Sequence, residues 1–184
     1  MPLDIDAATG LIKGVRQVLS PHFDARPAGV VADLIIVHGI SLPPGEFGGP
    51  WIDALFTGGL PAGRHPYFES IKGLRVSSHV VIRRDGGLTQ YVPFTRRAWH
   101  AGVSEYCGRT ACNDFSIGIE LEGTDERPYE AAQYTALAAL VRALLATHPS
   151  LSRERLVGHS DVAPGRKTDP GSAFDWARLR TLLG

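Results

Sequence analysis

The chain has 184 residues, of which 43% are hydrophobic, and its 19 Lys plus Arg balance its 19 Asp plus Glu, so the formal net charge is zero. This length and composition are typical of one globular domain with a full core and argue against a disordered chain. DNA- and RNA-binding proteins normally carry a basic excess, so the charge balance argues against nucleic acid as a partner.

The N-terminal sequence lacks the cationic start and apolar run of a secretory signal, and no apolar stretch approaches the roughly 18 residues of a membrane span. We therefore expect a cytoplasmic protein that has no membrane partner. Cys107 and Cys112 do not have the spacing of a zinc knuckle, and reduced thiols are expected in that compartment.

The first half of the chain predicts strands on either side of an irregular segment. Residues 33–39 (DLIIVHG) are a short branched apolar run that ends at a glycine, which is typical of a buried strand. Residues 76–94 predict a hairpin around the turn sequence Asp85-Gly86-Gly87. The segment between them is rich in Gly and Pro and poor in strong helix formers, so it predicts an irregular wall or lid of a cleft.

The second half predicts two strands and two helices. Residues 115–123 alternate apolar with small or polar residues, and residues 155–160 (RLVGHS) contain a second, shorter strand. Residues 128–149 carry an apolar stripe at helical spacing, and residues 173–183 predict a closing helix. Strands before and after helices predict one domain of the α/β (α+β) class, with a mixed central sheet flanked by helices.

Two histidines and one aspartate leave the ends of predicted strands. His38 ends the first strand, His159 ends the short one, and Asp169 follows ten residues later in GHSDVAPGRKTDPG, where Gly and Pro prevent a helix. Two histidines and a carboxylate are a donor set of catalytic zinc sites, which keep a fourth position open for water. Core or structural histidines are the alternative, and the spacing alone does not decide between them.

Hydrolysis at such a metal also needs a base and a cation near the reacting carbonyl. Lys167 stands two residues before Asp169 and is the candidate cation, with an ordinary surface lysine as the alternative. Glu120 is the candidate base, unless it is a carboxylate on an edge strand facing water. Glu122 would point to the same sheet face, so strand geometry leaves both carboxylates open.

Several longer segments resemble one known group of enzymes. They include HGISLPPGEFGGPWIDALFTG, LRVSSHVVIRRDG, QYVPFTRRAWHAG, CNDFSIGIELEGTD and RKTDPGSAFDWARLR. Together they resemble the AmpD-type 1,6-anhydro-N-acetylmuramoyl-L-alanine amidases of the zinc-dependent amidase-2 family, whose fold is shared with peptidoglycan recognition proteins and phage T7 lysozyme. The resemblance covers residues 33–183. It implies one domain over 1–184, with 1–30 as an N-terminal extension packed on a family core of about 30–184.

The resemblance implies a function and assigns roles. The expected reaction cuts the amide between anhydro-muramic acid and the L-Ala of the stem peptide, during recycling of wall fragments in the cytoplasm by a monomeric enzyme. One Zn²⁺ is implied at His38, His159 and Asp169, with Glu120 rather than Glu122 as the catalytic carboxylate and Lys167 as the catalytic lysine. In some bacteria such an activity also controls β-lactamase induction.

Substrate contacts are implied less directly. Trp99 and His100 are expected to line the cleft, and Arg75 to meet substrate carboxylates. Two positions depart from the family pattern: Gly39 stands where Asn is common, and Ala111 where Arg is common, with Arg109 two residues upstream. Two other functions stay open at this point, an amidase acting on intact cell wall and a non-catalytic peptidoglycan-binding module.

Overall fold

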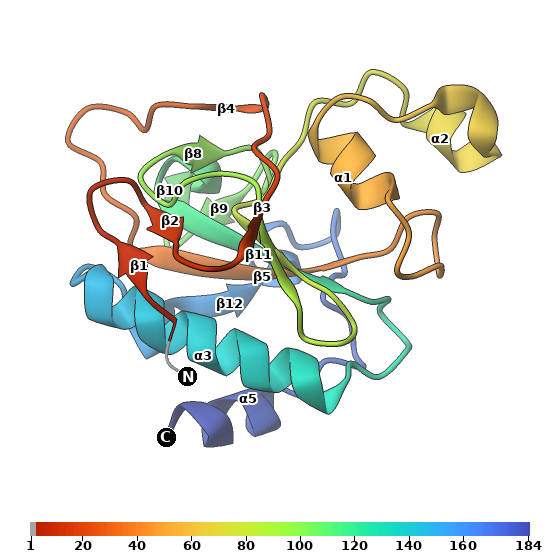
Figure 1. Ribbon diagram of the computed structural model, residues 1–184. Helices are drawn as coiled ribbons and strands as arrows, with labels where there is room; N and C mark the ends of the chain where they lie inside the picture. Colours follow the sequence, from red (N-terminus) through yellow and green to blue (C-terminus); the bar gives the residue numbers. More distant parts are fainter. Residues whose placement is uncertain (1–2) are drawn as a thin grey trace.

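A six-stranded mixed sheet forms the centre of the computed structural model, which describes residues 3–184 (Figure 1). The strands lie in the order β12 (Leu156–Gly158), β5 (Leu34–Ile40), β11 (Ser116–Glu122), β6 (Val80–Ile82), β7 (Leu88–Gln90) and β3 (Arg16–Gln17). All neighbours are parallel except the hairpin pair β6 and β7. All seven residues of β11 are buried, because the parallel part of the sheet has other elements packed on both of its faces.

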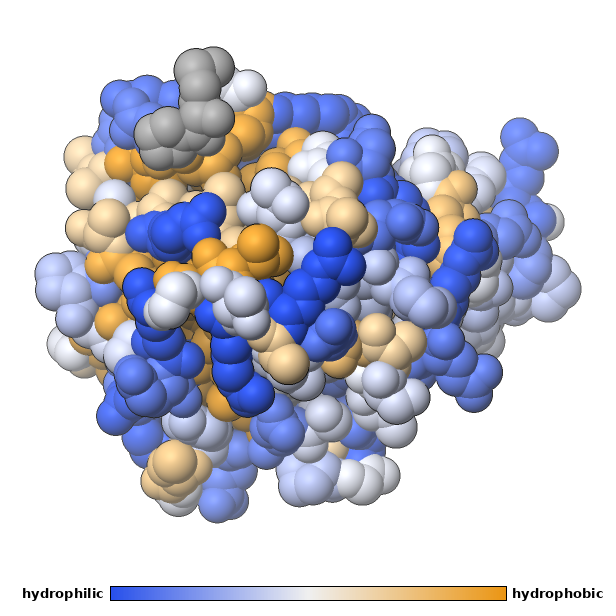
Figure 2. All heavy atoms as spheres, turned by 90° about the horizontal axis from the view of Figure 1, so that it is seen from below, coloured by the Kyte–Doolittle hydropathy of each residue, from blue (hydrophilic) through white to orange (hydrophobic). Residues whose placement is uncertain are grey.

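Two helices cover one face of this sheet and lie below it in Figure 1. The longer, α3 (Ala131–Thr147), buries Leu137, Val141 and Leu144 in the main core, and α5 (Trp176–Leu183) packs against it. Glu130 and Gln133 form a capping box at the start of α3, and the Asp175 carboxylate accepts the backbone N–H of Arg178 at the start of α5. Seen from this side, hydrophilic side chains cross the apolar areas (Figure 2).

The remaining elements are short. They comprise β1 (Ile5–Asp6), β2 (Leu11–Ile12), β4 (Phe23–Asp24), α1 (Trp51–Phe56), η1 (Ala62–Arg64), α2 (Pro66–Ser70), β8 (Arg97–Ala98), β9 (Glu105–Tyr106), β10 (Arg109–Thr110), η2 (Cys112–Asp114), η3 (Arg153–Arg155) and α4 (His159–Val162). Helices α1 and α2 lie on the side of the sheet away from α3 (Figure 1). Ile52 and Phe56 of α1 and Phe68 of α2 are buried in a second apolar cluster with Val81 and Tyr91.

The fold class and most predicted elements are confirmed. The strand expected at 33–39 is β5, the hairpin is β6–β7, and the long helix is α3. One prediction was wrong in part: the Gly/Pro-rich segment contains α1 and α2. Local propensity is poor there, but the apolar side of α1 is stabilised by tertiary packing. His159 begins α4 rather than ending β12.

Residues 5–17 contact the central sheet and α3. Residues of β3 pair with β7 at one sheet edge, and the β1–β2 hairpin contacts α3. Cys107 is exposed and Cys112 buried, both as free thiols. Within residues 3–184, no helix has both the length and the hydropathy needed to cross a membrane.

Candidate metal centre and catalytic pocket

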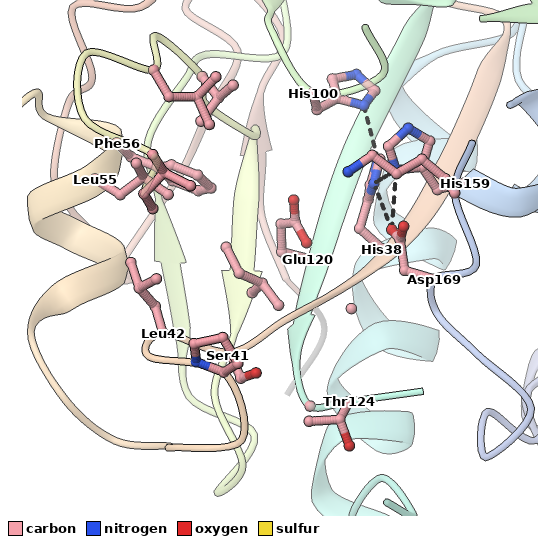
Figure 3. A pocket seen from close by; sticks show the side chains of 18 of the residues that line it. His38, Ser41, Leu42, Leu55, Phe56, His100, Glu120, Thr124, His159 and Asp169 are labelled. Carbon is pink, nitrogen blue, oxygen red and sulfur yellow. Dashed lines mark hydrogen bonds and ion pairs between the residues drawn. The ribbon is translucent and has the colours of Figure 1, made fainter. Parts of the chain in front are cut away.

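Three ligand-type side chains converge at the carboxyl ends of neighbouring parallel strands. His38 lies near the end of β5, His159 follows the adjacent β12, and Asp169 comes from the loop after α4. The two Nδ1 atoms are 3.0 Å apart, and Asp169 Oδ2 lies 3.2 Å from His38 Nδ1 and 3.1 Å from His159 Nδ1. Tertiary structure thus brings together the three residues that the sequence proposed as ligands (Figure 3).

The donor set and spacing fit a zinc ion. Tetrahedral Zn²⁺ with bonds of about 2.0–2.1 Å places its ligand atoms roughly 3.3 Å apart, close to the distances found here. Burial lowers the pKa of His38 to about 4, so its ring is neutral at pH 7, as a ligand must be. Burial would raise the pKa of Asp169, but the two histidines outweigh it and hold that pKa below its usual range. His38 is therefore a neutral donor and Asp169 an anionic one.

A pocket of about 560 Å³ opens beside this cluster. Glu120 points into it from β11, between the histidine cluster and the wall formed by Leu55 and Phe56 of α1 (Figure 3). The volume of this pocket lies in the range of pockets that hold a small ligand. The end of β5 and the segment that follows it also line the pocket, with residues 39–42, 44 and 45, so the expectation of a cleft wall in this region is confirmed.

Glu120 is buried in surroundings that favour its protonated form. The residue is only 8% exposed, and burial raises its pKa well above the usual value, helped by the negative charge of Asp169. The positive charge of Lys167 acts in the opposite direction. Lys167 itself is solvent-exposed and lines the same pocket, so the positive charge of its ammonium group acts on the Glu120 carboxyl.

Glu122 occupies a different environment from Glu120. Its Oε1 accepts hydrogen bonds from Arg83 and from the backbone N–H of Gly48, and its Oε2 accepts the N–H of Arg84. Both oxygens are therefore already hydrogen-bonded within the protein, Oε1 to Gly48 and Arg83 and Oε2 to the backbone of Arg84. Of the two carboxylates, Glu120 is the one that lines the pocket beside His38, His159 and Asp169. The strand that carries both, β11, is a central strand and not an edge strand.

The proposed substrate-binding residues are placed unequally. Trp99 and His100 line the pocket, while Arg75 is exposed nearby with its guanidinium 5.8 Å from the Trp99 ring. Arg109 is not brought to the pocket, because it pairs with Asp33 at 2.7 Å and lies over the Phe115 ring. The roles of all four in substrate binding stay predictions.

The sequence also left some pocket features unassigned. At Gly39, a Cβ would collide with the Tyr129 hydroxyl, which donates to the Pro170 carbonyl. Tyr129 therefore fills the space that a side chain at 39 would take. Thr124 and Leu55 also line the pocket. The motifs ELEGTD and WIDALF contained them, but no chemistry marked either residue.

Comparison with known proteins identifies related sequences over nearly the whole chain. The family model described as N-acetylmuramoyl-L-alanine amidase matches residues 28–172. A protein of Escherichia coli (strain K12) named 1,6-anhydro-N-acetylmuramyl-L-alanine amidase AmpD is 61% identical over 174 residues, covering 95% of this chain and 94% of that protein.

Solved structures agree with these matches. A crystal structure of a selenomethionine AmpD derivative superposes with a TM-score of 0.94 at 58% identity, covering 98% of this chain and 99% of that one. A complex of E. coli AmiD with anhydro-N-acetylmuramic acid-L-Ala-D-γ-Glu-L-Lys gives a TM-score of 0.61 at 26% identity, covering 85% and 60% of the two chains.

Proposed function

The chain belongs to the N-acetylmuramoyl-L-alanine amidase family, as its motifs predicted, and from this premise we propose that it hydrolyses the amide between 1,6-anhydro-N-acetylmuramic acid and the L-Ala of a stem peptide. The observation that carries the proposal is the convergence of His38, His159 and Asp169 beside Glu120 in one pocket. The relative at 61% identity is named for this bond, and the AmiD relative was solved with an anhydro-muropeptide.

We propose Zn²⁺ as the metal of this site. His38, His159 and Asp169 would hold it and leave a fourth position toward the pocket. When bound, zinc acts as a Lewis acid, which polarises a carbonyl and lowers the pKa of a water molecule to about 7.

Glu120 is proposed as the general base and then the general acid. Its buried carboxylate faces the same pocket as the ligand cluster and, because its pKa is raised, binds a proton more readily than an exposed glutamate. It would take the proton of the attacking water and deliver it to the leaving amine of L-Ala. Leu55 and Phe56 form an apolar wall opposite, which limits the water that competes for this carboxylate.

Lys167 is proposed to stabilise the oxygen that becomes negative when the carbonyl is attacked. A positive charge placed before the reaction lowers the barrier more than one that must reorganise. Support comes from its place in the pocket lining and from its electrostatic effect on Glu120 and His38. Trp99 and Arg75, neighbours at the pocket, are proposed for the sugar and a peptide carboxylate.

A mass-spectrometric assay on soluble 1,6-anhydro-N-acetylmuramyl tripeptide tests the proposal. Zinc-loaded protein should release free tripeptide, and chelator-treated protein should not. Glu120→Gln and Lys167→Ala should each reduce kcat by about 10²- to 10⁴-fold, the range for removing an acid–base or an electrostatic group. Glu154→Gln and Lys72→Ala, at exposed positions outside the pocket, are the matched controls and should match the wild type.

Two other outcomes would replace this proposal. If the loaded protein leaves the soluble fragment intact but clears a suspension of purified cell wall, the enzyme acts on intact wall. If it binds the fragment without turnover, it is a peptidoglycan-binding module. The complete set of proposed ligands, base and cation favours hydrolysis over binding alone.

We also propose that the protein works in the cytoplasm as a monomer, in the recycling of wall fragments. The support is the resemblance of its motifs to the recycling amidases. Cell fractionation would detect the protein in the soluble cytoplasmic fraction, and light scattering would give the mass of one chain. Recovery from the periplasm or a dimeric mass would contradict this placement.

A further inference from the structure

The two histidines of the proposed metal site are each held through the ring nitrogen that faces away from it. His38 Nε2 lies 2.9 Å from His100 Nδ1, and His159 Nε2 lies 3.1 Å from the Ala101 carbonyl oxygen. Both partners are consecutive residues of one segment, just after β8. Two consecutive residues therefore contact both rings from behind, His100 through its side chain and Ala101 through its backbone carbonyl.

These contacts determine which nitrogen of each ring is free to bind a metal. A carbonyl oxygen only accepts, so His159 carries its proton on Nε2 and presents the lone pair of Nδ1. His38 presents Nδ1 in the same way only if its Nε2–H donates to His100 Nδ1. His100 then carries its own proton on Nε2, which lies 3.2 Å from Ser116 Oγ. With both Nδ1 lone pairs on a metal, these contacts are consistent with one tautomer for each of the three rings.

We propose that His100 is a positioning residue for the metal site: together with the Ala101 carbonyl, it fixes the tautomer and the orientation of His38 and His159. This inference rests on the proposed zinc site. Both ring nitrogens of His100 are already hydrogen-bonded within the protein, so we assign it this role in place of the substrate contact expected from the sequence. Partners behind metal-bound histidines commonly strengthen the site in this way.

The segment that carries these partners is itself tightly held. Asn113 Oδ1 accepts the backbone N–H of His100 at 3.1 Å and of Ala101 at 2.8 Å. The Arg166 guanidinium donates to the carbonyls of Ala101 and Val103, each at 2.6 Å. Asn113 and Arg166 therefore hold the backbone of residues 100–103 in place before any metal binds.

The central strand also leaves space for the His100 ring. A Cβ at Gly118 of β11 would collide with the ring atoms of His100. Glycine at this position, inside a strand where side chains usually improve packing, is explained by this close approach. The sequence FSIGIELEG therefore provides both the pocket carboxylate, Glu120, and the space behind the ligands.

Zinc affinity, measured by competition with a chromophoric chelator, tests the inference apart from catalysis. His100→Leu replaces the ring by an apolar side chain of similar size and removes the hydrogen-bond acceptor. The dissociation constant for zinc should then rise by about 10- to 100-fold. His100→Asn places its Oδ1 near the former Nδ1 and should recover most of that loss. His148→Asn, a half-buried histidine at the end of α3, is the matched control and should bind zinc as the wild type does.

The outcomes separate this inference from the metal site itself. A folded His100→Leu variant with wild-type zinc affinity would overturn it, as would equal losses in the Leu and Asn variants. If His100→Leu does not fold, Asn113→Ala, which frees the segment, decides: unchanged affinity overturns the inference and a weaker site supports it. A wild type that binds no zinc refutes the proposed metal site, and with it this role.

Discussion

Glu120 of β11 lies directly opposite His38 of β5 in the parallel register of the two central strands. The proposed base and the first proposed ligand therefore occupy the same level of the sheet, near the carboxyl ends of adjacent strands. Ligands in open sheets with parallel strands generally bind at this edge. The register of two buried strands is difficult to shift, because a slip of one residue would turn every side chain to the other face.

Replacing Glu120 should separate catalysis from metal binding. Glu120 lies outside the group of three ligand atoms, so Glu120→Gln should keep wild-type zinc content while kcat falls by about 10²-fold or more. Zinc stoichiometry by atomic absorption and steady-state kinetics on the soluble muropeptide measure the two effects. Loss of zinc together with activity would make Glu120 a ligand instead.

Removing the metal should lower thermal stability. The three ligands come from β5, the start of α4 and the loop after it, so a bound ion joins segments that are far apart in sequence. At a zinc concentration of about 100 times Kd, binding stabilises the folded state by roughly 2.7 kcal/mol. For a chain of this size, that corresponds to a rise in Tm of about 5–10 °C. Differential scanning calorimetry with and without chelator measures it, and equal Tm values would contradict the site.

Asp53 should stabilise the fold in a pH-dependent way. It joins α1 to β3 through Arg16 at 2.7 Å and to the turn after β6 through Arg83 at 3.0 Å, and it accepts a hydrogen bond from the Tyr91 hydroxyl. Burial would raise the pKa of Asp53, but hydrogen bonds from Arg16 and Tyr91 and the positive charges outweigh it, so that pKa is lowered. Its contribution is therefore full above the ordinary carboxyl pKa of 3.8 and is lost as pH falls through the lower, folded value.

Asp53→Asn should accordingly cost about 1–3 kcal/mol of unfolding free energy at pH 7, and less below pH about 4. Urea unfolding at both pH values measures this difference. Asp4→Asn, which breaks only the exposed Lys13 pair, is the control and should leave the free energy of unfolding close to the wild-type value at both pH values. An Asp53 penalty that does not change with pH would show that its charge is not the stabilising feature.

Adding one methyl group at Gly118 should disturb the metal site from behind. Gly118→Ala forces the His100 ring away from His38, and overpacking of this kind costs about 1–3 kcal/mol. Zinc affinity should fall in parallel with stability. Gly63→Ala is the matched control, because a Cβ there meets no atom within 4 Å. A Gly118→Ala protein with native Tm and native zinc affinity would contradict the close approach.

The sequence by itself determined the elements whose signals are local. The branched run at β5, the Asp85-Gly86-Gly87 turn and the apolar stripe of α3 depend on neighbours a few residues away, and all three are present. Residue chemistry also offered His38, His159 and Asp169 as a candidate donor set, with structural histidines as the alternative, and the fold brings the three together. Helices α1 and α2 were missed, because their stability comes from packing on a distant cluster and not from propensity.

Only the tertiary structure showed where each candidate side chain lies and what it contacts. Glu120 and Glu122 have the same strand spacing, and they differ because Arg83 and the residue 48–49 loop take the second carboxylate. His38 contacts His159 across 121 residues and His100 across 62. Such contacts depend on strand order, which places β12 and β11 on either side of β5. The physical reason is that contacts between side chains far apart in sequence depend on how strands and helices pack together. The local sequence determines only which residues of each strand or helix share a face.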